Sequence, residues 1–282
     1  MTPFPHVAVV DWSAASQPSP AREAADAIWI GICGPDGETT QYHRTRDGAE
    51  AALTALCATG RWLIGFDFPM GYPAGFAARL TGHAAASAVW HWLADQISDG
   101  PDNRNNRFAI AAAINRQFGG GPFWGRPATL DLPDLPPRKT VDYARLGLPE
   151  RRRVEQAVPR AQPVWKLFTT GSVGSQSLMG LPMIARLAAR PGISVWPFHP
   201  PARVVLTEVY PSLLGHRITE AMAQGETIKD RAQVRLLARA LWQLSHSGQL
   251  AALLADAPDS VCQEEGWILG AGHAAALQRA AA

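Results

Sequence analysis

Two short apolar runs that each end in an aspartate limit most strongly how this chain can fold. Residues 7–10 (Val-Ala-Val-Val) lead directly into Asp11, and residues 62–66 (Trp-Leu-Ile-Gly-Phe) lead into Asp67. A short, continuous apolar run is typical of a strand that is covered on both faces. An acid at the end of such a strand needs a partner, because an unpaired buried charge is costly. The runs therefore predict buried strands that carry carboxylates at their ends.

Strand and helix patterns alternate along much of the remaining chain. We expect further strands at 27–33, 39–45, 163–168, 193–198 and 203–210, and helices at 47–58, 83–97, 177–190, 231–245 and 249–255. The turn residues Gly34-Pro-Asp-Gly37 indicate a hairpin between the strands 27–33 and 39–45. A hairpin followed by alternating helices and strands predicts an α/β fold, in which helices flank both faces of a mixed sheet.

Residues 70–162 differ from the rest of the chain. They are rich in Gly, Pro and Arg and contain only one convincing helix pattern. Irregular stretches of this length inside a compact domain are usually functional or inserted. We therefore predict a core formed by residues 1–69 and 163–282, interrupted by an insertion subdomain at 70–162.

Composition and missing motifs exclude several classes of protein. The three cysteines, Cys33, Cys57 and Cys262, have neither zinc nor disulfide spacing, which favours a reducing, cytoplasmic location. The N-terminus lacks the pattern of a secretory signal, and no apolar run approaches the roughly 20 residues of a membrane span. The sequence contains no HExxH, GxSxG or GxxxxGK[ST] motif, which argues against a zinc protease, an α/β-hydrolase and a P-loop NTPase.

Four acids form the candidate catalytic and metal-binding set: Asp11, Asp67, Glu208 and Asp230. Carboxylates that converge from different segments bind hard cations such as Mg²⁺ or Mn²⁺, and two such ions can promote phosphodiester hydrolysis. Each acid has a simpler explanation. Asp11 and Asp67 also fit turns or caps, Glu208 fits an exposed edge strand, and Asp230 fits a capping box that opens the helix at 231–245.

The segments around these acids resemble a known family. Val10-Asp-Trp-Ser13, Ile64-Gly-Phe-Asp-Phe-Pro-Met-Gly71, Thr207-Glu-Val-Tyr-Pro211 and Lys229-Asp-Arg-Ala232 are similar to segments of the uncharacterised DUF429 family, regarded as nucleases of the ribonuclease-H-like superfamily. The resemblance covers roughly 6–69 and 163–270. It implies a ribonuclease-H-like fold and metal-binding roles for the four acids. Many relatives carry a second acid in the last helix, Asp-Ala-x-Asp-Ala, which this sequence lacks after Asp230.

The insertion offers candidate substrate-binding residues. Residues 101–166 contain twelve Lys or Arg and six Asp or Glu, a net charge of +6 in a chain of net charge +2, and Phe123, Trp124 and Trp165 lie among them. Cations interleaved with aromatic rings are typical of single-strand binding, although a solvated insertion would look similar. We predict that Lys166, Ser172, Arg151, Arg152 and Trp124 contact a substrate. Ser172 belongs to a Gly/Ser-rich segment that fits either an anion site or a plain turn.

These patterns together predict a Mg²⁺- or Mn²⁺-dependent nuclease with a nucleic acid or nucleotide as its partner. One alternative is a protein of the same fold that binds a nucleotide or RNA without cleaving it. Another is an enzyme of small-molecule or cofactor metabolism that would use ATP. A metal titration separates the first alternative, and a thermal shift with ATP separates the second.

Overall fold

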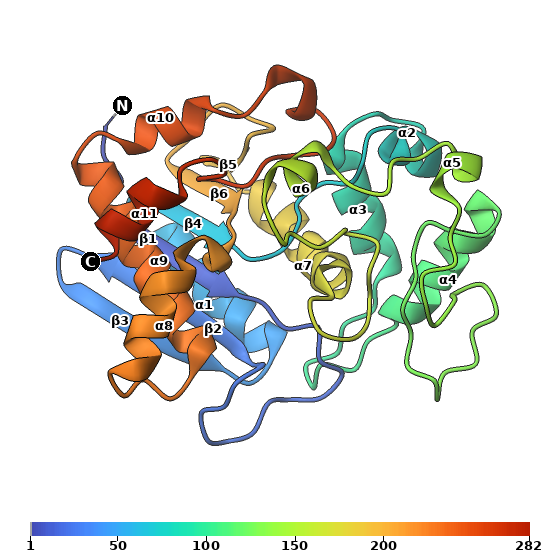
Figure 1. Cartoon of the computed structure of the whole chain (residues 1–282), viewed down its shortest axis with the longest axis horizontal. Coiled ribbons are helices and arrows are strands. Elements are labelled where there is room, and N and C mark those ends of the chain that lie inside the picture. Colours follow the sequence, from blue (N-terminus) through green and yellow to red (C-terminus); the bar gives the residue numbers. More distant parts are fainter. Residues whose placement is uncertain (1) are drawn as a thin grey trace.

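A six-stranded mixed sheet forms the centre of the protein. The computed structural model describes residues 2–282. The strands are β1 (His6–Asp11), β2 (Ile28–Gly34), β3 (Gly37–His43), β4 (Trp62–Phe66), β5 (Ile193–Trp196) and β6 (Val204–Glu208), in the order β3-β2-β1-β4-β6-β5 (Figure 1). The α-helices are α1 (Arg46–Ala58), α2 (Phe76–Thr81), α3 (Ala86–Gln96), α4 (Arg107–Phe118), α5 (Tyr143–Leu146), α6 (Arg153–Ala157), α7 (Val173–Ala188), α8 (Gly215–Ala223), α9 (Lys229–His246), α10 (Leu250–Ala255) and α11 (Ala274–Ala280). The predicted α/β class is confirmed.

The strands divide into an antiparallel and a parallel half. β1, β2 and β3 pair antiparallel, whereas β4, β6 and β5 continue from β1 in parallel. The predicted hairpin forms, with Gly34 opposite Gly37. The strand predicted at 163–168 is wrong, because that segment makes only an isolated bridge between Lys166 and Trp124. Val164, Trp165 and Leu167 are buried outside the sheet whereas Phe168 is exposed, and a short apolar run alone cannot distinguish these cases.

Helix α9 covers one face of the sheet, together with α8 and α11 (orange to red in Figure 1). The helix packs directly on the backbone of β2. A Cβ atom at Gly31 would lie 2.5 Å from the carbonyl group of Val234 in α9. Glycine is therefore required at this position for the helix to approach so closely.

Helix α9 runs against the direction of β1. The backbone N–H of Phe4, just before β1, donates to the hydroxyl of Ser245 near the end of α9 at 2.7 Å. The end of β1, where Asp11 lies, is therefore on the side where α9 begins and Asp230 lies. The fold thus brings the first and the last predicted acid to the same region.

Helices α1, α3 and α7 pack on the opposite face, and the core there extends without interruption into the insertion. Close packing also holds α7, because a Cβ atom at Gly180 would lie 2.3 Å from the ring of Phe68. The insertion carries α2 to α6 at the right of Figure 1. Its centre is a group of buried rings, which are Tyr72, Phe76, Phe118, Phe123 and Trp165.

Within residues 2–282, no helix combines the length and the apolar character that crossing a membrane requires.

Candidate functional site

Asp11 and Asp67 lie side by side at the ends of two parallel strands. Val10 of β1 is paired with Phe66 of β4, so the next residue on each strand is an aspartate. The backbone N–H of Asp67 donates to the carbonyl of Val10 at 3.1 Å, and the N–H of Trp12 donates to Asp67 Oδ1 at 2.8 Å. The two carboxyl groups lie close enough for each to shift the pKa of the other.

This pair is electrostatically strained. Burial raises the pKa of Asp11 well above its usual value, and the charges of Asp67 and Asp230 raise it further. Burial also raises the pKa of Asp67 to about 7, although the hydrogen bonds from Trp12 and Asp11 oppose this shift. Two adjacent carboxyl groups are more stable with one proton between them than with both groups charged.

Asp230 faces this pair from the first turn of α9. The sequence suggested a capping box, but the carboxylate makes no capping bond to its own helix. It accepts instead from the backbone N–H of Asp26 at 2.7 Å, across 204 residues of chain. Asp26 has a left-handed backbone, with φ of 56°, and its charge adds to the field on Asp11. Asp26 was not among the predicted site residues, because no sequence motif marks it.

A cavity of about 620 Å³, which we call the acidic pocket, opens beside Asp11, Asp26 and Asp230, whereas Asp67 lies behind Asp11 and does not line it. Asp11, Asp26 and Asp230 line it on one side, and Arg107 and residues 167–172 line it as well. The volume lies within the usual range of small-molecule sites. The pocket therefore provides room for a ligand beside the acids.

The prediction that Glu208 joins these aspartates is corrected by the structure. Glu208 is paired in register with Phe66 and so lies one residue short of the level of Asp67. Successive side chains of a strand point to opposite faces, which sends Glu208 toward the face covered by α7. Both of its carboxylate oxygens accept from Arg152, each at 2.7 Å.

The prediction that Arg152 contacts a substrate is also corrected by the structure. Arg152 is only 1% exposed and bridges Glu208 and Glu155, with a distance of 2.7 Å from its Nε to Glu155 Oε1. Burial alone would lower the pKa of Arg152, but the charges of Glu208 and Glu155 raise it. The backbone N–H of Met70 adds a bond to Glu208 at 3.1 Å. These contacts tie the insertion to the sheet rather than bind a ligand.

The other residues predicted to contact a substrate differ in whether they reach the acidic pocket. Ser172 lines the acidic pocket at the start of α7, and its side chain does not cap the helix. The ammonium of Lys166 donates to the carbonyl of Thr170 at 2.6 Å and lies 6.0 Å from the ring of Trp124. Arg151 donates to two backbone carbonyls. Of these residues, only Ser172 lines the acidic pocket.

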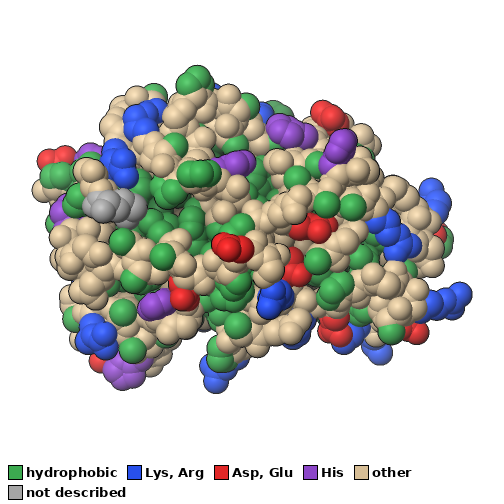
Figure 2. Space-filling view, turned by 90° about the horizontal axis from the view of Figure 1, so that it is seen from above, with side chains coloured by type: hydrophobic (Ala, Val, Ile, Leu, Met, Phe, Trp, Pro, Cys, Tyr) green, Lys and Arg blue, Asp and Glu red, His purple; other side chains and the backbone are tan. Residues whose placement is uncertain are grey.

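Part of the positive charge predicted on residues 101–166 lies in local ion pairs, which leave the net charge of +6 unchanged because their acids are already counted in it. Four of the cations form ion pairs with acids of the same segment: Arg104 with Asp102, Arg116 with Asp134, Lys139 with Glu150, and Arg152 with Glu155. Figure 2 shows Lys and Arg side chains projecting into solvent at the end of the molecule opposite the sheet. The net charge of the segment therefore belongs largely to a solvated surface.

Three residues of interest were assigned wrongly or missed. Phe123 and Trp165, predicted among stacking rings, are fully buried in the insertion. Phe168, which the sequence did not single out, is 41% exposed and lines the acidic pocket. Exposure of a ring depends on tertiary packing, so the sequence gives no clear signal for it.

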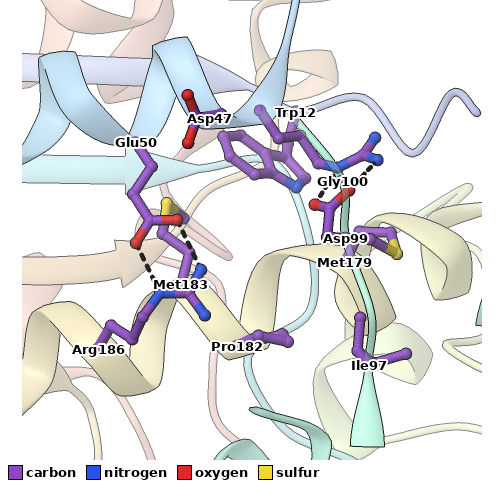
Figure 3. Close-up of a pocket in the computed structure, with 11 residues that line it drawn as sticks. Trp12, Asp47, Glu50, Ile97, Asp99, Gly100, Met179, Pro182, Met183 and Arg186 are labelled. Atoms are coloured by element: carbon purple, nitrogen blue, oxygen red, sulfur yellow. Dashed lines mark hydrogen bonds and ion pairs between the residues drawn. The ribbon is translucent and has the colours of Figure 1, made fainter. Parts of the chain in front are cut away.

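A neighbouring pocket of about 380 Å³ shares Trp12 with the acidic pocket. Figure 3 shows the Trp12 ring between Asp99 and the Arg186–Glu50 ion pair, and Asp99 is itself paired with Arg46. Each arginine is already neutralised by a carboxylate. Apart from Asp47, the charged side chains of this pocket are therefore paired with one another, and the acidic pocket is the stronger candidate site.

The donor set of the acidic pocket suits a hard cation only in part. No group of three or more His, Cys, Asp or Glu side chains among residues 2–282 is arranged to hold a metal ion. Asp11 and Asp67 form no ion pair with Lys or Arg within the same range. Mg²⁺ is commonly bound through one or two carboxylates, with water or substrate oxygens completing its shell. A pair of carboxylates beside a pocket fits that pattern.

Comparisons with protein-family models, with curated proteins and with solved structures find no match to this chain. The resemblance to the DUF429 family therefore stays a prediction.

Proposed function

We propose that the protein is a divalent-cation-dependent phosphodiester hydrolase that acts on nucleic acid in the acidic pocket. One observation carries the proposal. Asp11 and Asp67 meet at the ends of two parallel strands and form no ion pair with any cation of residues 2–282, and Asp230 lines the acidic pocket with Asp11. Burial and the charges of Asp67 and Asp230 raise the pKa of Asp11, and an acid in such surroundings gains most from a bound cation.

The strand order supports a ribonuclease-H-like assignment of the fold. Three antiparallel strands precede parallel strands that continue from β1, in the order β3-β2-β1-β4-β6-β5. The acids follow β1 and β4 and begin α9, which are the positions implied by the resemblance to the DUF429 family. Fold alone does not define an activity, so the proposal depends on the acids rather than on the topology.

Asp11 and Asp67 would hold a Mg²⁺ or Mn²⁺ ion. Such an ion supplies Lewis-acid stabilisation of a phosphoryl oxygen when it is bound. Asp230 lies near enough to influence the charge of Asp11, and we assign it to holding water or substrate at the edge of the site. Trp12 positions Asp67 through its backbone N–H. Glu208 has no catalytic role in this proposal, since Arg152 occupies both of its oxygens.

A cleavage assay with Asp11→Asn tests the proposal. Wild-type protein should cleave at least one of single-stranded, hybrid or structured nucleic acids in the presence of Mg²⁺ or Mn²⁺, and a chelator should abolish the cleavage. Asp11→Asn should lower the rate by at least about 100-fold, because it removes a charge that binds the cation. Asp36→Asn, in the exposed turn between β2 and β3, is the matched control and should be fully active.

Equal cleavage by wild type and Asp11→Asn would reject the site. The absence of a preformed group of three acids favours one alternative, a protein that binds nucleotide or RNA without cleaving it. That alternative predicts no stabilisation by Mg²⁺ in a thermal-shift measurement, whereas the proposed hydrolase should be stabilised.

A further inference from the structure

Arg107 at the start of α4 is a buried guanidinium that no carboxylate neutralises. It is 8% exposed, and it forms no ion pair with any residue in the range 2–282. Its Nε donates to Ser175 Oγ at 3.0 Å, and its Nη1 donates to Ser16 Oγ at 2.9 Å and to Asn105 Oδ1 at 2.7 Å. These neutral oxygens fix its orientation without cancelling its charge. A buried charge that lacks a counter-ion is costly unless a ligand supplies one.

One end of this guanidinium is free to meet such a ligand. Its Nη2 makes no hydrogen bond with the described part of the chain. Arg107 lines the acidic pocket and also a second cavity of about 560 Å³, which we call the apolar pocket. By contrast, Arg46 and Arg186, in the cavity of Figure 3, are both paired with acids. Arg107 thus marks an anion position at the junction of two pockets.

The apolar pocket is suited to a flat aromatic group. Phe108, Pro127, Leu130 and Leu132 line it, together with the polar side chains of Asn105, Asn106 and Asp131. Phe168 lines both pockets and is the exposed large hydrophobic side chain among residues 2–282. The rings of Phe168 and Phe108 are 6.5 Å apart at an angle of 74°. Exposed rings beside an anion site are typical stacking platforms for unpaired bases.

We propose that the apolar pocket is a nucleobase subsite, and that Arg107 binds the phosphate that links this nucleotide to the one in the acidic pocket. The inference rests on the proposed function, because the acidic pocket supplies the position of the cleaved bond. It specifies the substrate class as a single strand, since a base held by Phe168 cannot remain paired in a duplex. Double-stranded nucleic acid with no free end should therefore bind weakly.

Binding without cleavage tests the subsite. Fluorescence anisotropy in chelator would compare a labelled deoxyadenylate hexamer with an abasic hexamer of the same length. Wild type should bind the hexamer with bases more tightly. Phe168→Ala should weaken that binding by about 5- to 100-fold and leave abasic binding unchanged, while Phe168→Trp should retain it. Phe198→Ala, which alters a partly exposed ring at a different cavity, is the control.

Arg107→Gln tests the phosphate contact. It should weaken the binding of both hexamers to the same extent. It should also reduce the slope of log affinity against log salt by about 1, an effect that a purely structural role would not produce. Arg107→Lys keeps the charge and should retain the slope.

The two proposals fail in different ways. If Phe168→Ala binds both hexamers as wild type does, or if neither hexamer binds, the subsite is rejected even where Asp11→Asn abolishes cleavage. If base-dependent binding is lost in Phe168→Ala but no substrate is cleaved with any cation, the subsite stands and the hydrolase proposal fails.

Discussion

Replacing Arg152 by methionine is expected to lower the free energy of unfolding by about 3–5 kcal/mol. The substitution preserves much of the side-chain volume but leaves Glu208 and Glu155 in the interior without their shared cation. Burial already raises the pKa of Glu155, and removing the charge of Arg152 would raise it further. Denaturant-induced unfolding, followed by fluorescence of the buried tryptophans, would measure the loss.

Arg153→Met provides the matched control. Arg153 is the next residue in the chain, and its exposed side chain donates a hydrogen bond to Ser260. We expect this substitution to change stability by less than about 1 kcal/mol. Adding Glu208→Gln to Arg152→Met should recover part of the loss, since one of the stranded charges is then removed. A loss no larger than that of Arg153→Met would show that the buried network does not form, and Glu208 would again be available as a metal ligand.

Asp67→Asn is expected to act in the opposite direction and to stabilise the protein by about 2 kcal/mol at pH 8. The backbone N–H of Trp12 donates to Asp67 Oδ1 at 2.8 Å, and the amide oxygen of asparagine can still accept this hydrogen bond. The amide nitrogen can donate to Asp11, so a repulsive contact becomes an attractive one. Protein sites built for binding often carry such strain, and removing it gains stability at the expense of function.

The pH dependence provides a sharper test of this prediction. The pKa of Asp67 is raised to about 7 in the folded protein, against an ordinary value of 3.8. The folded state therefore holds the proton more tightly, and the carboxylate costs stability increasingly as pH rises from about 4 to 7. The advantage of Asp67→Asn should be small at pH 4 and complete by pH 8. Asp36→Asn should show no such trend. A variant that is destabilised at pH 8 would contradict a strained acidic pair.

The positions of Asp11 and Asp67 could be predicted because they depend on local pattern. Each follows a short apolar run, and strands of that kind end together when they pair in parallel. The hairpin was equally clear from its turn residues, Gly34 and Gly37. These features require only the alternation of side chains and the chemistry of turns.

Glu208 could not be placed in the same way. Its strand was expected, but the register that aligns it with Phe66, and so turns it to the other face, is set by pairing across the sheet. Its partner Arg152 comes from the insertion, 56 residues away. The exposure of Phe168 and the isolation of Arg107 also depend on packing between distant segments. No local sequence pattern encodes such relations.

The most direct test of the acidic site is a crystal soaked in Mn²⁺ and measured for anomalous scattering. We expect a peak within coordination distance of the carboxylate oxygens of Asp11 and Asp67, with Asp230 at its edge and none beside Glu208. A soaked crystal in which Mn²⁺ binds elsewhere, or in which no ion contacts Asp11 and Asp67, would contradict the proposed hydrolase.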